Sequence, residues 1–172
     1  MDADEKRIRK YESALNLLFY EGEIAWQLNL VFIALNVGVA ALVGSELNNI
    51  KVKPDILLAI YGFLGLFITL LWLGTFNRNN RYYRFRIAQA REAEPEEWQF
   101  LRIRGYKFSH GEKIVIDSPD IDAKDKDHQL SFFENKVSNK SALKWAIYLI
   151  IIAYIVLILF SFFSIHVIVK IN

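Results

Sequence analysis

The chain has 172 residues and contains no cysteine, which excludes a disulfide framework and a thiolate metal site. Its three histidines, His110, His128 and His166, are too dispersed along the sequence to indicate a metal centre. The sequence also lacks a glycine-rich phosphate loop, a nucleophile triad and a pair of candidate catalytic carboxylates. We therefore expect no cofactor, no metal site and no enzymatic activity.

Charge is missing as well, but only from three long segments. Charged residues make up 23% of the chain, yet the segments 24–44, 56–76 and 145–169 contain no Asp, Glu, Lys or Arg. Each is long enough to cross a bilayer core, which requires about 20 residues of helix. The sequence predicts an all-α membrane protein with three transmembrane helices per protomer, and it excludes an ordinary soluble enzyme as the default interpretation.

The basic residues predict the orientation of these spans. The loop 45–55 carries two lysines, whereas the segment 77–143 carries seven arginines and six lysines. Lys and Arg are retained on the cytoplasmic side. We therefore expect the N-terminus and residues 77–143 to be cytoplasmic. Trp26, Trp72 and Trp145 lie at or near the ends of the spans, where an amphipathic ring suits the membrane interface.

Four parts are predicted along the chain. Residues 1–23 form an N-terminal cytoplasmic helix, which either lies at the membrane interface or continues into the first span. Residues 24–76 form a transmembrane hairpin, residues 77–143 a small and mainly helical Arg-rich cytoplasmic region, and residues 144–172 the third transmembrane helix with a short tail.

Proline and glycine residues predict where helices begin and end in the cytoplasmic region. We expect the second span to extend as a helix up to Pro95, where a new helix begins with Pro in its first turn. The helical pattern then fails from Gly105 to about Leu130, with a short strand within residues 113–117 and an acidic loop after it.

Two polar side chains stand out in the first span. Asn29 and Asn36 are seven residues apart and share one helix face. An amide in hydrocarbon needs a hydrogen-bond partner, so this face either lines a water-filled pore or joins neighbouring helices. In the second span, Gly62, Gly65 and Gly74 favour close approach of helices.

The strongest charge feature follows the second span. A cytoplasmic basic cluster consists of Arg78, Arg81, Arg84, Arg86 and Arg91. It suits anionic lipid headgroups, RNA or a nucleotide, or a ring of cations at a channel mouth. Ordinary positive-inside charge, partly paired with nearby glutamates, explains it equally simply.

Arg104 and His110 form an R-x5-H pair, a spacing within the R-x4–6-H pattern of HEPN ribonucleases. That chemistry requires both side chains to converge from a helix. Gly105, Ser109 and Gly111 flank the pair and argue against a helix. We therefore expect a structural or regulatory role for the pair rather than RNA cleavage.

Two segments carry a resemblance to a known family. EGEIAWQLNLVFIALNVG (residues 21–38) and LWLGTFNRNNRYYRFRIAQAREAEPEEW (residues 71–98) resemble the RipA-like family of small bacterial inner-membrane proteins. This family includes the membrane accessory protein of type VI-B CRISPR systems. The resemblance implies a homo-octameric ring that forms a pore, with a divergent HEPN-like cytoplasmic region.

The predicted function follows from that resemblance. We expect a homo-oligomeric inner-membrane pore that permeabilises or depolarises the membrane and enhances RNA-guided antiphage defence. Its partners are then copies of itself, membrane lipids and, functionally, an RNA-guided CRISPR ribonuclease. The alternative is a non-conducting membrane scaffold or sensor that binds a partner, lipid or nucleotide through its Arg-rich segment.

Overall fold

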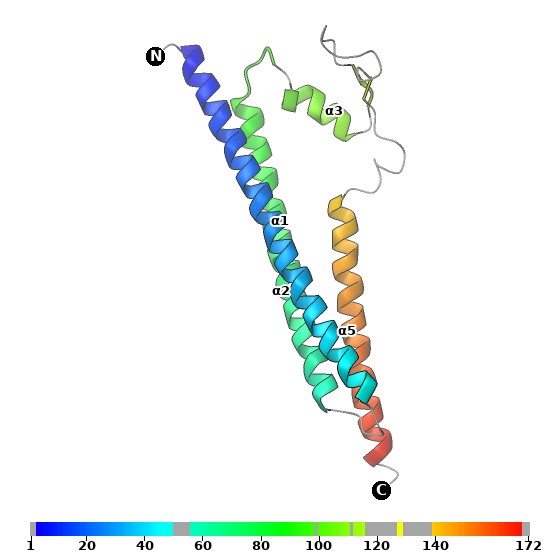
Figure 1. Ribbon diagram of the computed structural model, residues 1–172. Helices are drawn as coiled ribbons and strands as arrows, with labels where there is room; N and C mark the ends of the chain where they lie inside the picture. Colours follow the sequence, from blue (N-terminus) through cyan, green and yellow to red (C-terminus); the bar gives the residue numbers. More distant parts are fainter. Residues whose placement is uncertain are drawn as a thin grey trace. The chain divides into compact units, whose positions relative to one another are not determined.

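The computed structural model describes residues 3–49, 56–98, 100–110, 112–115, 127–128 and 139–169. The described elements, in chain order, are α1 (Ala3–Asn49), α2 (Ile56–Ala93), η1 (Phe100–Arg104), α3 (Gly105–Ser109), β1 (Ile114–Val115), β2 (Asp127–His128) and α5 (Asn139–Val169) (Figure 1). Three of them, α1, α2 and α5, contain stretches long and apolar enough to cross a membrane. The prediction of a helical protein with three membrane-length helices is therefore confirmed.

The first helix is continuous from Ala3 to Asn49. Its 47 residues rise about 70 Å at 1.5 Å per residue, more than twice the thickness of a bilayer core of about 30 Å. A separate interfacial helix over residues 1–23 is therefore not formed, and the alternative in which this segment continues into the first span is confirmed for residues 3–23. The physical reason is that no proline interrupts the backbone ladder between these residues.

The second helix extends beyond the apolar segment to Ala93, as predicted. Pro95 disfavours helical geometry at the residue before it, so α2 ends there. The next helix does not begin at Pro95. Residues 96–98 form a turn in which the Trp98 N–H donates to the Pro95 carbonyl at 3.1 Å, and helical structure resumes at Phe100.

The predicted failure of the helix at Gly105 is wrong. The short π-helix η1 leads directly into α3, which includes Gly105 and ends at Ser109. A glycine in a helix costs about 1 kcal/mol relative to alanine, which lowers helix stability without ending the helix. The predicted short strand is present as β1, which pairs antiparallel with β2 through Ile114–His128 and Val115–Asp127. The predicted acidic loop lies largely within residues 116–126, outside the described part of the chain.

The chain divides into two compact units. One, the charged unit, consists of Met1–Glu23 and Asn80–Ala142. The other, the apolar unit, consists of Ile24–Asn79 and Leu143–Asn172. In the apolar unit the core centres on Trp72, Phe76 and Ile147.

Candidate functional site

Asn29 and Asn36 each contact a side chain of α2. The Trp72 indole Nε1 donates a hydrogen bond of 2.8 Å to Asn29 Oδ1. The same indole stacks on Phe32, with ring centroids 6.2 Å apart. Trp72 is only 2% exposed, so its ring packs against α1 and does not face the surroundings of the protomer, while its depth at a membrane interface stays a prediction. It lies on the face of α2 that meets α1, whereas Trp26 and Trp145 are exposed.

Asn36 is buried and lies at the centre of a polar cluster between helices. Thr69 Oγ1 donates to Asn36 Oδ1 at 2.8 Å and also lies 2.7 Å from the Gly65 carbonyl oxygen, so its single proton is shared. Asn36 Nδ2 donates to the Phe32 carbonyl at 2.9 Å. The amide therefore satisfies its own polarity inside one protomer, which removes the cost of several kcal/mol that an unpaired amide has in apolar surroundings.

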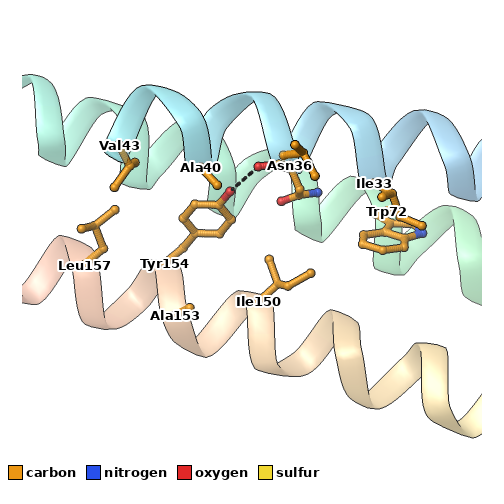
Figure 2. Close-up of a pocket in the computed structure, with 10 residues that line it drawn as sticks. Ile33, Asn36, Ala40, Val43, Trp72, Ile150, Ala153, Tyr154 and Leu157 are labelled. Carbon is orange, nitrogen blue, oxygen red and sulfur yellow. Dashed lines mark hydrogen bonds between the residues drawn. The ribbon is translucent and has the colours of Figure 1, made fainter. Parts of the chain in front are cut away.

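The third membrane-length helix approaches the same point. The Tyr154 hydroxyl of α5 donates to the Asn36 backbone carbonyl at 3.4 Å (Figure 2). A Cβ atom at Gly65 would overlap the Tyr154 ring, and one at Gly62 would lie 2.7 Å from Ile158 Cγ1. The predicted close helix approach is confirmed for these two glycines. Gly74 has nothing within 4 Å of a Cβ built on it.

A hollow of about 430 Å³ lies between α1, α2 and α5 beside this cluster. Figure 2 shows Asn36 and Trp72 on one side of it and Tyr154 reaching in from α5. Its lining consists of Ile33, Asn36, Val37, Ala40, Val43, Trp72, Ile150, Ala153, Tyr154 and Leu157. The lining contains no carboxylate, cation or histidine and is mostly apolar, so the hollow suits apolar groups.

The basic cluster separates into an outward and an inward set. Arg78, Arg81 and Arg84 are exposed along α2. Arg86 is half-buried, lies 3.5 Å from the Glu21 carboxylate and donates to Gln89 Oε1 at 2.9 Å. Arg91 is also half-buried. The outward set therefore exposes more of its side chains than Arg86 and Arg91 do.

Glu94 and Arg102 were not singled out by the sequence, yet they join α2 to η1. Glu94 is 1% exposed, and its two carboxylate oxygens accept the backbone N–H groups of Leu101 and Arg102 at 2.8 and 2.9 Å. In return, the Arg102 guanidinium donates to the carbonyls of Arg91 and Glu92 at 2.6 and 3.1 Å. Each charge thus caps a helix end of opposite polarity. The sequence contained one indication of this cap. Glu94 stands beside Pro95, which ends α2, and an acidic residue shortly before a new helix is a common N-terminal cap.

Tyr11 packs beside this double cap. Its ring is buried and meets the Trp98 ring edge-on, with centroids 5.5 Å apart. Burial raises the pKa of the Tyr11 phenol, and the nearby negative charge of Glu94 raises this pKa further. The phenol therefore stays neutral in the packed charged unit well into alkaline conditions.

Arg104 and His110 both lie on helical or turn backbone and are exposed. The Arg104 guanidinium lies 5.8 Å from the centroid of the Phe100 ring. His110 stacks on Tyr106, with centroids 4.1 Å apart, and its Nδ1 lies 2.8 Å from the Tyr106 carbonyl oxygen. Each residue thus contacts an aromatic residue about one turn before it. The assignment of the pair to a HEPN-like motif stays a prediction.

The chain was compared with protein-family models, curated proteins and solved structures. No family model matches the chain, and neither a curated protein nor a solved structure matches it.

Proposed function

We propose that this chain is a bacterial inner-membrane protein that assembles with copies of itself into a pore. The pore permeabilises or depolarises the membrane and, as the resemblance to the RipA-like family implies, enhances RNA-guided antiphage defence. Three helices of one protomer pack around side chains and cannot enclose a water path. A conducting assembly therefore requires several copies in a ring, for which the resemblance implies eight.

The face of α1 opposite Asn36 carries the proposal. Its exposed small side chains repeat at helical spacings of three and four, as Ala34, Gly38, Ala41 and Ser45. A Cβ atom built at Gly38 meets nothing within 4 Å. Small residues in membrane helices permit close helix packing. Since Gly62 and Gly65 use this property against α5 within the protomer, the open face of α1 is suited to a helix of a second copy.

In this proposal the two asparagines belong to the wall of the ring. Asn29 and Asn36 hold α1 against α2 through Trp72 and Thr69. Gly38 follows Asn36 by two residues, which is a rotation of about 200° on a helix. One side of α1 therefore faces the protomer's own helices, and the other is left for assembly. The Arg-rich extension of α2, with Arg78, Arg81 and Arg84, then lies at the cytoplasmic end of the ring.

The test measures ion flux from liposomes that contain the purified protein, together with the mass of the same sample in detergent. We expect flux from a high-order oligomer. A Gly38→Leu variant should fall apart into smaller species and lose most of the flux, because the added side chain prevents close helix contact. Gly74→Leu is the matched control, since Gly74 also has open space around it.

Two outcomes would contradict the proposal. A monomer or dimer without flux would exclude the pore and favour the non-conducting scaffold. Equal loss of assembly in Gly38→Leu and Gly74→Leu would show that the α1 face has no special part in assembly. The defence role has its own test, which compares phage survival in cells that carry the RNA-guided ribonuclease with and without this chain.

A further inference from the structure

One turn of α2 in the charged unit exposes side chains on every side. Arg81, Tyr82, Tyr83, Arg84 and Phe85 are consecutive, and all five are exposed. Because a helical turn has 3.6 residues, these five side chains surround the whole circumference of the helix. Three of them are aromatic, an unusual surface for a segment that water alone surrounds.

The neighbouring part of α1 adds two more exposed rings. Phe19 is 70% exposed and Tyr20 is 60% exposed. Contacts within the charged unit place them at the same level, since a Cβ at Gly22 lies 3.8 Å from the Tyr83 ring and Glu21 pairs with Arg86. We call this set of seven side chains the Arg-aromatic belt: Phe19, Tyr20, Arg81, Tyr82, Tyr83, Arg84 and Phe85.

The belt lies where the sequence leaves the hydrocarbon. Tyr20 precedes the apolar segment 24–44 by four residues, about 6 Å of helix rise. Arg81 and Phe85 follow Phe76, the end of the apolar segment 56–76, by five and nine residues, about 7.5 and 13.5 Å. The headgroup layer is about 5–7 Å thick on each side of the hydrocarbon core. Tyr20 and Arg81 therefore lie at the outer edge of that layer, and Arg84 and Phe85 lie about 5 Å or more beyond it, a distance that the long side chain of Arg84 can reach back across.

The charges of the belt fit phosphate. The ion pair described at this level joins Arg86 to Glu21, which neutralises that carboxylate. Arg81 and Arg84 project from the same helix as exposed guanidinium groups, and guanidinium binds phosphate oxygens with two parallel N–H donors. Tyrosine and other amphipathic rings are enriched at the same membrane depth.

We propose that the Arg-aromatic belt binds the headgroup phosphates of anionic phospholipids in the cytoplasmic leaflet. Arg81 and Arg84 hold the phosphates, and the surrounding rings anchor the two helices at the headgroup level. The inference rests on the transmembrane placement of α1 and α2 and not on conduction, so lipid binding and ion flux can fail separately.

The experiment uses the full chain purified in a neutral detergent. Phosphatidylglycerol and phosphatidylcholine with identical acyl chains are titrated separately, and the retained lipids are counted by native mass spectrometry. We expect selective retention of phosphatidylglycerol. Arg81→Gln with Arg84→Gln should weaken that retention by about thirtyfold, from about 1 kcal/mol per juxtamembrane base at 1.4 kcal/mol per factor of ten. Arg81→Lys with Arg84→Lys should largely restore it.

The matched control removes the same charge elsewhere. Lys6→Gln with Arg7→Gln changes two exposed bases that lie more than 25 Å of helix rise before residue 24. This control should bind phosphatidylglycerol like the parent protein. Circular dichroism and the mass of each variant show that its helices and assembly are retained.

Three results would overturn the proposal. Equal retention of the two lipids would show that the belt does not select lipids by the charge of their headgroups. An equal loss in the Lys6/Arg7 control would show a general effect of net charge. Displacement of phosphatidylglycerol by equimolar inorganic phosphate or a short single-stranded RNA, with loss of that binding in the Arg81/Arg84 variant, would assign the belt to a soluble ligand instead.

Discussion

The paired helices α1 and α2 contribute to both units, and the contacts between them differ in chemistry. In the apolar unit they are joined by neutral hydrogen bonds from Trp72 to Asn29 and from Thr69 to Asn36. In the charged unit they are joined by an ion pair between Arg86 and Glu21. A charge at the centre of a bilayer costs several kcal/mol, whereas an amide costs less and is satisfied by one neighbour. The surrounding solvent therefore selects which polar groups can join the same two helices.

The close contact between α2 and α5 should be the most sensitive feature of the apolar unit. Gly65→Leu places a side chain where the Tyr154 ring lies, and we expect a loss of about 3 kcal/mol or more in the free energy of unfolding. Unfolding in mixed micelles, followed by circular dichroism, measures it. Gly74→Leu makes the same change in open space and should cost less than 1 kcal/mol. Similar losses in both variants would refute the assigned packing.

In the charged unit, the most sensitive feature should be the double cap that Glu94 and Arg102 form between α2 and η1. Glu94→Ala removes the acceptor of two backbone N–H groups. We expect a loss of about 1 kcal/mol in the free energy of unfolding for each of the two hydrogen bonds. Hydrogen exchange should show faster exchange at Leu101 and Arg102, with the amides of α5 unchanged. Glu94→Gln retains one oxygen and should fall between Ala and the parent. Unchanged exchange at both amides would contradict the cap.

The hydrogen bond between Asn36 and Thr69 should have a smaller effect. Thr69 retains the Gly65 carbonyl as a partner when Asn36 is changed, so the coupling is limited. A double-mutant cycle with Asn36→Leu and Thr69→Val should give a coupling of about 0.6 kcal/mol, typical of membrane helices. A coupling above 2 kcal/mol would show that this bond is more important to the unit than its geometry indicates.

Tyr11 should show the smallest effect, and only at alkaline pH. Its phenol is expected to ionise above the ordinary value of about 10, because burial and then Glu94 raise its pKa. The unfolded chain loses this proton first, so the contribution to stability is present below pH 10 and is lost as pH rises above it. Ultraviolet titration measures the pKa. Glu94→Gln should lower it partway, since burial remains. A pKa at the ordinary value in the parent would contradict the buried position.

Several features were predictable from local sequence because they depend on one segment at a time. The absence of charge from three segments marks the three membrane-length helices, since desolvating a charge is costly wherever the helix packs. Pro95 marks the end of α2 because its ring constrains the preceding residue. Gly62 and Gly65 indicate close helix packing because they lack side chains.

The interaction partners were decided only by tertiary structure. Asn29 and Asn36 required a partner, but Trp72 and Thr69 lie on another helix, and their choice depends on how the two helices are rotated against each other. For the same reason, the Trp72 ring is buried against α1. In the sequence, Glu94 and Arg102 are indistinguishable from ordinary surface charges. The turn after Pro95 places each of them at the end of a helix, where it caps backbone groups. The sequence by itself determined which groups needed a partner, and three-dimensional packing determined which partner each one has.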